Sequence, residues 1–240
     1  MATPDGNAWQ VARVQAIAQE TPLSRTITFQ LPGPAEHLAG QHYELRLTSS
    51  TGYQAARPYS AASAADADGL LDITIANVPR GEVSPYLDGL LAVGDQVEIR
   101  GPFGNFFVWT PKLTQPVLLV AGGSGVAPMR SILQAHRAAR SKSPMQLLYS
   151  TRSYDEIPYK SELLDMPNVL VTLTGNDVPD DWDGATGRID AELVSQALAH
   201  MAADVMCYVC GMTRFVEAAA DLLIACGVPA ARIKTERFGA

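Results

Sequence analysis

The sequence predicts two successive domains, an all-β domain followed by an α/β domain with a doubly wound parallel sheet. Before Pro111, short runs rich in branched and aromatic residues are separated by Gly, Pro, Ser and Asp, without a long amphipathic helix. This pattern is typical of a small closed barrel or a sandwich. After Pro111, strand-like and helix-like segments alternate, which predicts right-handed β-α-β units. The boundary falls near Trp109 to Gln115.

Individual elements follow from hydrophobic periodicity. The strands expected in the first domain are Trp9 to Ala18, Arg25 to Gln30, His42 to Thr48, Leu71 to Ala76 and Gln96 to Arg100. In the second domain, the continuous apolar run from Val117 to Ala121 is typical of a central parallel strand covered on both faces. The segments expected after it are a helix near Ala127 to Arg140, a strand at Gln146 to Ser150, the strand and helix pairs Val169 to Thr174 with Asp190 to Met201 and Val205 to Cys210 with Thr213 to Cys226, and a last strand at Arg232 to Glu236.

Composition excludes several classes of protein. Of 240 residues, 47% are hydrophobic and 18% charged, which is typical of a globular chain. The formal net charge of -7 argues against a nucleic-acid binder, because phosphate backbones are recognised through positive surfaces. No apolar run approaches the roughly 20 residues of a spanning helix, and the segment from Met1 to Gln10 is polar. We therefore expect a cytoplasmic protein without a membrane anchor.

The three cysteines, Cys207, Cys210 and Cys226, are too few for a disulfide framework. Cys207 and Cys210 match C-x-x-C, but they lie on an expected buried strand, where residues three apart point to opposite faces. An iron–sulfur cluster needs about four thiolate ligands. We expect no metal site, so that any iron–sulfur acceptor is a separate molecule.

A glycine-rich turn, Gly122 to Gly125, joins the first strand of the second domain to its helix. Glycines let a ligand approach the backbone, and a helix start presents unpaired N–H groups, so a pyrophosphate can bind there. The spacing is G-G-S-G-x-x-P and differs from the G-x-G-x-x-G fingerprint. A turn in which the glycines serve only tight packing of the strand against the helix would have the same sequence pattern.

Two segments of the first domain also carry ligand-binding chemistry. Arg57 can pair with phosphate, Tyr59 can lie against an aromatic ring system, and the Ser60 hydroxyl can bond a ring nitrogen. A strand end with a surface arginine and a packed tyrosine gives the same pattern. The turn from Pro79 to Leu87 enters a short expected helix with Ser84 as its capping candidate, either for phosphate or as a plain cap.

The joint order of the motifs is more specific than any one of them. In succession they resemble the ferredoxin–NADP reductase superfamily over nearly the whole chain, most of all its compact bacterial flavoprotein reductases without a fused iron–sulfur domain. The motifs are Arg57-Pro58-Tyr59-Ser60, Gly81-x-Val83-Ser84, Gly101 to Phe106, Gly122 to Pro128, Tyr208 to Met212 and Glu236 to Gly239.

The resemblance implies a fold and a cofactor set. Residues 1–112 would form a six-stranded antiparallel β-barrel that binds FAD, or less often FMN. Residues 113–240 would form the doubly wound domain that binds NADH or NADPH. A flavin joins these chemistries, because nicotinamide gives two electrons as hydride whereas iron–sulfur and haem acceptors take one at a time.

The resemblance also implies roles for residues. Arg57 would bind the flavin phosphate, Tyr59 would pack on the ring or ribityl chain, and Ser60 would bond near N5. Ser60, Cys210 and Glu236 would stand at the reaction centre. The implied cofactor contacts are Arg57, Pro58, Tyr59, Ser60, Ile75, Asn77, Val78, Gly81, Glu82, Val83, Ser84, Gly123, Ser124, Gly125, Thr151, Arg152, Lys160, Cys210, Gly211, Met212 and Phe238. Met212 departs from the family, which often has proline there.

The choice between nicotinamides rests on the second strand of this domain. Tyr149 to Arg152 ends without a carboxylate that would bond a ribose 2′-hydroxyl, and Arg152 with Lys160 can attract a 2′-phosphate. This favours NADPH slightly. Against it, relatives that use NADP often have an arginine where this chain has Thr174-Gly175.

These inferences predict a monomeric NAD(P)H oxidoreductase that moves hydride onto FAD and passes electrons to a separate acceptor such as ferredoxin or an oxygenase component. One alternative is a self-sufficient reductase of free flavin or small molecules. The other is a non-catalytic flavin or nucleotide sensor, because fold does not fix function.

Overall fold

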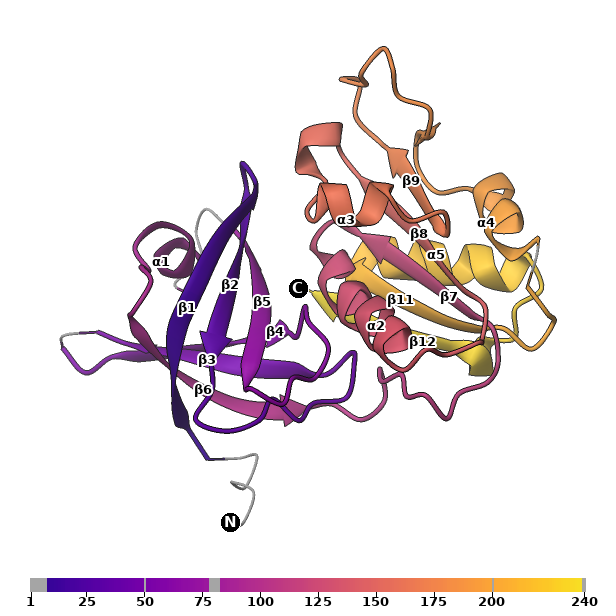
Figure 1. The fold of residues 1–240 in the computed structure, drawn as a ribbon. Helices are drawn as coiled ribbons and strands as arrows, with labels where there is room; N and C mark the ends of the chain where they lie inside the picture. Colours follow the sequence, from indigo (N-terminus) through magenta and orange to yellow (C-terminus); the bar gives the residue numbers. More distant parts are fainter. Residues whose placement is uncertain (1–7, 50, 78–82, 200, 239–240) are drawn as a thin grey trace. The chain divides into compact units, whose positions relative to one another are not determined.

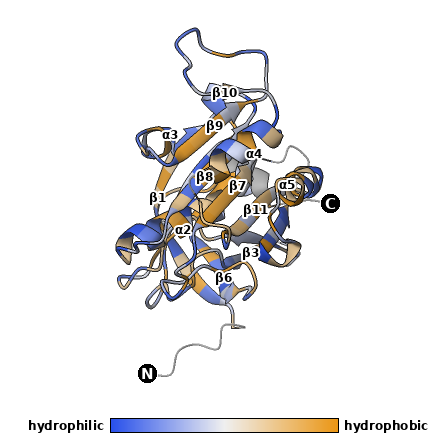
Figure 2. Ribbon diagram, turned by 90° about the vertical axis from the view of Figure 1, so that its right-hand side faces the viewer, coloured by the Kyte–Doolittle hydropathy of each residue, from blue (hydrophilic) through white to orange (hydrophobic). Residues whose placement is uncertain are grey.

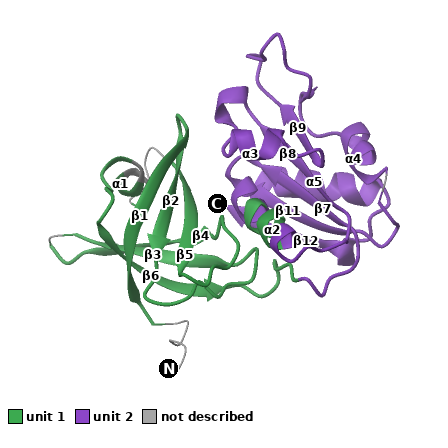
Figure 3. Ribbon diagram, viewed as in Figure 1, with its two compact units in different colours: residues 1–110, 130–135 green, residues 111–129, 136–240 purple. Residues whose placement is uncertain are grey.

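The computed structural model describes residues 8–49, 51–77, 83–199 and 201–238. Its contacts divide the chain into two compact units, one of residues 1–110 and 130–135 and the other of residues 111–129 and 136–240 (Figure 3). Each unit is built on a six-stranded sheet (Figure 1).

The first unit is an antiparallel sheet with the strand order β4-β3-β6-β1-β2-β5. A bridge between Ala61 and Ile73 joins the segments at its two edges, β4 and β5, so that the sheet closes on itself. Its elements are β1 (Gln10–Thr21), β2 (Ser24–Gln30), β3 (His42–Thr48), β4 (Gln54–Ser60), β5 (Leu70–Ala76), α1 (Ser84–Gly89) and β6 (Gln96–Phe103). The predicted six-stranded antiparallel domain is confirmed.

Alternation along the strands makes the core of this unit. Leu71, Ile73 and Ile75 of β5 are fully buried, while the residues between them are half-buried. This is the period of two that places every second side chain inside. Strand β4 was not among the expected strands, because Ala55, Ala56 and Pro58 give it little β propensity.

The second unit is a parallel sheet with the strand order β10-β9-β8-β7-β11-β12. The chain reverses direction of winding at β7, which pairs with β8 on one side and β11 on the other. Its strands are β7 (Val117–Gly122), β8 (Met145–Thr151), β9 (Val169–Leu173), β10 (Ala185–Thr186), β11 (Met206–Met212) and β12 (Ile233–Phe238). Ligands of such sheets bind where the winding reverses, at the carboxyl ends of the strands.

Helices cover this sheet in the doubly wound arrangement that the sequence predicts. Val216, Ala219 and Leu223 of α5 pack with Val194 of α4 against the strands. Figure 1 shows α2 on the face turned away from α5, and Figure 2 shows the central strand β7 in hydrophobic colours. The helices are η1 (Gly123–Gly125), α2 (Val126–Ala138), η2 (Tyr154–Glu156), α3 (Lys160–Leu164), α4 (Ala191–Leu198), α5 (Thr213–Ala225) and η3 (Ala230–Arg232).

Local details differ from the expectation in two places. Helix α1 begins at Ser84, and the residue at its N-cap is Val83, which makes no side-chain cap bond. Ser84 is therefore not the cap of this helix. The short elements η2, α3 and β10 were not expected, because each is too short to show a period. None of the helices in the described residues has the length and apolar character needed to cross a membrane.

Candidate active site

The segment Arg57 to Ser60 ends β4, an edge strand of the first unit. The strand register sets Arg57 opposite Leu45 and Tyr59 opposite Tyr43, whereas Ser60 lies opposite His42. Arg57 is exposed and donates to the carbonyl of Ala56 at 2.8 Å. A charged group on an edge strand stays accessible to a ligand that lies along that edge.

Tyr59 and Ser60 are less accessible than the arginine. Tyr59 is half-buried and packs against the core of the barrel, and burial raises the pKa of its phenol to about 12. The ring is therefore neutral at physiological pH and has one side in the core. Ser60 is buried, with 6% of its surface exposed. Pro58 is exposed beside them.

The second candidate segment of this unit lies on the other edge strand, β5. Ile75 is fully buried, so it can offer only backbone atoms, and Asn77 is half-buried, with its backbone N–H donating to the carbonyl of Leu23 at 2.8 Å. Val83 is buried just before α1. The predicted contacts Val78, Gly81 and Glu82 lie outside the described residues.

Two edges of one sheet thus carry the candidate flavin residues. The Ala61 to Ile73 bridge follows Ser60 directly and holds the end of β4 next to the middle of β5. A guanidinium, a phenol ring and a hydroxyl on one edge can meet a phosphate, a ring system and a ring heteroatom, while the other edge offers backbone groups. This set of donors fits FAD.

The glycine turn of the second unit forms η1, directly after the central strand β7. Gly123 has a φ of +54°, and a Cβ added to it would meet nothing within 4 Å. Gly123 therefore supplies a left-handed conformation and an open side. At Gly125, a Cβ would lie 2.2 Å from the carbonyl oxygen of Cys210. Gly125 is thus tightly packed on β11, whereas Gly123 leaves an open side with room for a pyrophosphate.

Cys210 and Glu236 are cross-strand partners in β11 and β12. They belong to one row across the sheet that continues through Ala121 to Tyr149. Cys210 is fully buried, and burial followed by the charge of Glu236 raises the pKa of the thiol well above its usual value. The thiol is therefore protonated at neutral pH.

Strands β11 and β12 both end two residues after this row, at the carboxyl edge of the sheet. Met212 is 72% exposed and pairs in register with Phe238, which is half-buried. The sequence reasoning missed Phe215, at the start of α5. A Cβ on Gly122 or Gly211 would come within 2.8 Å of its ring, so both glycines make room for that ring. Its position three residues after Met212 was the available signal.

Arg152 and Lys160, which are expected near the ribose that carries the 2′-phosphate in NADPH, have acidic neighbours. Arg152 lies 3.9 Å from a carboxylate oxygen of Glu156, and Lys160 lies 3.4 Å from Asp155. The Thr151 hydroxyl donates to the carbonyl of Glu156 at 3.2 Å. These contacts reduce the positive potential available to a 2′-phosphate. The spacing of four between Arg152 and Glu156 was the signal in the sequence.

The three cysteines of the chain all lie in the second unit. All three are free thiols, and Cys207 packs in the apolar cluster of β11 with α5. Across the part of the chain that the structure describes, no group of three or more His, Cys, Asp or Glu side chains is arranged to hold a metal ion.

Comparison with known proteins identifies both units. Residues 11–108 match the family model of the oxidoreductase FAD-binding domain, and residues 119–221 match that of the oxidoreductase NAD-binding domain. NADH-cytochrome b5 reductase 1 of Scheffersomyces stipitis is 31% identical over 218 residues, which cover 87% of this chain and 76% of the relative. The chain belongs to the ferredoxin–NADP reductase superfamily.

Solved structures of the superfamily share this fold. The FAD/NAD-binding domain of nitric oxide dioxygenase from Vibrio cholerae matches with a TM-score of 0.83 and 25% identity, over 96% of this chain and 99% of that domain. The ferredoxin reductase in carbazole 1,9a-dioxygenase matches with a TM-score of 0.82 and 25% identity, over 97% of this chain and 70% of that protein. The protein is thus an NAD(P)H-dependent flavoprotein reductase, with FAD and a nicotinamide dinucleotide as its cofactors.

Proposed function

We propose that this reductase oxidises NADH and passes the electrons through FAD to a separate electron-acceptor protein, such as a ferredoxin, a cytochrome or an oxygenase component. The observation that carries the proposal is the contact between Gly125 and Cys210. It joins the open glycine turn, which suits a pyrophosphate, to the buried pair of Cys210 and Glu236 within one unit. Relatives named for protein acceptors support the second half of the proposal.

In this proposal the first unit holds the flavin. Arg57 binds its phosphate, Tyr59 supports the ring system or ribityl chain from the core side, and Ser60 bonds near N5. Asn77 and the backbone of Ile75 and Val78 are proposed to line the flavin from the other edge, and Gly81, Glu82, Val83 and Ser84 are proposed contacts for the pyrophosphate. When bound, the flavin accepts hydride and releases electrons one at a time.

The second unit holds the nucleotide. Gly123, Ser124 and Gly125 bind the pyrophosphate at the start of the helical segment formed by η1 and α2, where backbone N–H groups point outward. Cys210, Gly211 and Met212 contact the nicotinamide end, and Thr151, Arg152 and Lys160 lie toward the second ribose. The neutral thiol of Cys210 excludes water from its row without adding charge, and Glu236 and Phe238 complete this wall from β12.

NADH is the proposed donor, in place of the slight preference for NADPH that the sequence alone favours. Because Glu156 and Asp155 accompany Arg152 and Lys160, a 2′-phosphate would meet carboxylates as well as cations. Each nicotinamide is to be mixed with the oxidised protein without oxygen while bleaching of the flavin is timed. We expect a higher ratio of rate to half-saturating concentration with NADH, and the opposite order would contradict this part of the proposal.

The acceptor is tested separately, with flavin reduction as the control. The reduced protein is mixed with a plant-type ferredoxin, with cytochrome b5 and with free FMN, and reoxidation of its flavin is followed. Rapid turnover with one protein acceptor supports the proposal. Turnover with free FMN alone would favour a self-sufficient flavin reductase. A colourless protein that acquires no spectrum with added FAD would contradict the proposed reductase.

A further inference from the structure

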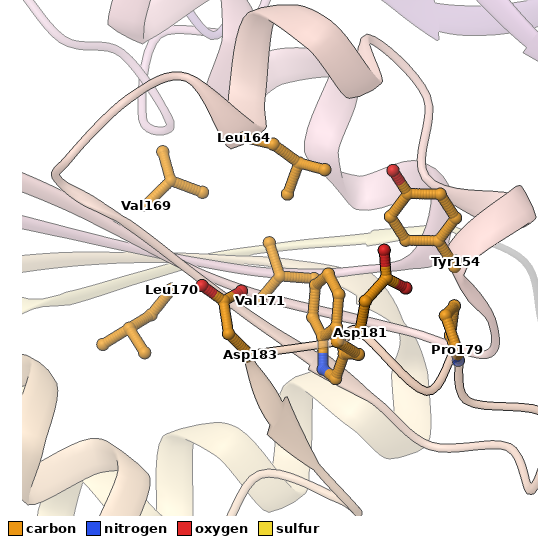
Figure 4. Close-up of a pocket in the computed structure, with 10 residues that line it drawn as sticks. Tyr154, Leu164, Val169, Leu170, Val171, Pro179, Asp181 and Asp183 are labelled. Carbon is orange, nitrogen blue, oxygen red and sulfur yellow. The ribbon is translucent and has the colours of Figure 1, made fainter.

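A cavity of the NAD-binding unit takes no part in the proposed cofactor contacts. It has a volume of about 450 Å³ and lies between β9 and the loop that leads from β9 to β10 (Figure 4). Its walls are formed by Tyr154, Leu164, Val169, Leu170, Val171, Pro179, Asp181, Trp182, Asp183 and Gly184. None of these residues is among the candidate contacts of either cofactor. The volume is in the range of small-molecule sites.

One wall of the cavity is aromatic and fixed in position. The indole N–H of Trp182 donates to the carbonyl of Ala185 at 3.0 Å. A Cβ on Gly184 would lie 2.3 Å from the indole, so this glycine lets the ring lie against the backbone. The ring of Tyr154 meets that of Trp182 edge to face, with 5.9 Å between the centroids. A ligand would therefore enter beside two rings whose orientation is already set.

The remaining polar groups of the wall are acidic. Figure 4 shows the carboxylates of Asp181 and Asp183 pointing to the side on which Leu164 and Tyr154 lie. The residues that line the cavity include no Lys, Arg or His. The protein itself shows that one of these rings accommodates a cation, because the Lys160 amine lies 4.0 Å from the centroid of the Tyr154 ring. Aromatic faces next to carboxylates favour a cationic ligand.

We propose that this cavity binds a small organic cation with an apolar body, such as an arylalkyl ammonium compound. The aliphatic wall of Leu164, Val169 and Leu170 would contact the apolar part, and Trp182 with the two carboxylates would contact the ammonium group. The cavity would then be a second ligand site on the NAD-binding unit. It does not depend on the proposed acceptor or on the choice of nicotinamide.

The probe for this site is phenethylamine, a cation at neutral pH, with 2-phenylethanol as its neutral counterpart. Binding is followed by NMR at the indole N–H signal of Trp182, which is assigned by its loss in Trp182→Leu. Phenethylamine is expected to shift this signal in a saturable way, and 2-phenylethanol at least about fivefold more weakly. The double variant D181N/D183N is expected to weaken phenethylamine binding about fivefold.

A matched control lies on the same loop. D177N/D180N removes the same two charges from exposed aspartates that do not line the cavity, and is expected to leave phenethylamine binding unchanged. Equal binding of the amine and the alcohol, or equal loss in both double variants, would overturn the proposal. Displacement of phenethylamine by NAD⁺ would also overturn it, because the cavity would then belong to the nucleotide site. The rate of flavin reduction by NADH in D181N/D183N, expected to be unchanged, keeps this result separate from the proposed function.

Discussion

Replacement of Gly125 by alanine should slow flavin reduction by NADH about a hundredfold while FAD stays bound. The new Cβ would lie 2.2 Å from the carbonyl oxygen of Cys210 and 2.8 Å from the amide nitrogen of Gly211. Both are backbone atoms of the buried strand β11, so the turn must move by about 1 Å to reach an ordinary contact. A misplacement of this size in a reacting complex costs about a hundredfold in rate. The overpacking should also lower the free energy of unfolding by about 1–3 kcal/mol.

The assay is anaerobic stopped-flow reduction of the bound flavin over a range of NADH concentrations. FAD content, measured from the visible spectrum, shows that the first unit is intact. Gly33→Ala is the control, because a Cβ there meets nothing within 4 Å and the residue has no positive φ. If Gly125→Ala reduced its flavin with unchanged rate and half-saturating concentration, the turn would not position the nucleotide and the reasoning would be refuted.

Three further perturbations test separate parts of the molecule. Ser60→Ala should reduce flavin at least about tenfold more slowly with FAD still bound, as expected for a lost positioning hydrogen bond, and an unchanged stopped-flow rate would remove Ser60 from the mechanism. Arg130→Met should lower the free energy of unfolding in urea by about 1–3 kcal/mol, because the guanidinium is 3.0 Å from both a carboxylate oxygen of Asp72 and the carbonyl of Ala62, and the added Asp72→Asn should restore part of the loss. Burial lowers the pKa of His37 below 6.5, so the unfolded chain takes up its proton first as pH falls. The stability contributed by neutral His37 is complete above pH 6.5 and is lost below it, so the drop in Tm between about pH 7.5 and about pH 5.5 should be smaller in His37→Gln, and an equal drop would contradict the assignment.

The architecture could be predicted because apolar residues are arranged differently in the strands of the two units, in continuous runs in one and in alternation with polar residues in the other. The continuous apolar run at Val117 to Ala121 became the central strand β7, and the alternating run at Leu71 to Ala76 became β5. Strand β4 was missed because its sequence is not typical of a strand. It is held by its partner β3, with Pro58 opposite Glu44, and an edge strand tolerates a proline.

The candidate residues could be found from motif order, but their neighbours could not. Nothing local in the sequence predicts that Ala61 bridges Ile73 and so brings the two flavin segments to adjacent edges. The packing of Phe215 on two glycines likewise depends on where α5 starts relative to β7. Such contacts join residues far apart in the chain, and hydrophobic period carries no information about them.

The positions of Cys207 and Cys210 could be predicted from the period of two along a strand. Residues three apart on a strand point to opposite faces. Cys207 indeed packs in the cluster with α5, whereas Cys210 lies in the row with Glu236. A disulfide between them would require the strand to break, because the two side chains lie on opposite faces of it.

The protonation state of Cys210 limits what the pair with Glu236 can do. A thiolate in that row would face the carboxylate of Glu236 in a buried setting, and both burial and that charge keep the thiol protonated. Hydride transfer from a nicotinamide needs no acid or base, so a neutral thiol is compatible with the reaction. Cys210→Ser should therefore leave the pH dependence of flavin reduction unchanged near neutrality and alter only its rate. If the pH dependence of flavin reduction in the wild type shows an ionisation near neutrality that is absent in Cys210→Ser, the thiol titrates during turnover. The assignment of Cys210 as an uncharged wall of the site would then be wrong.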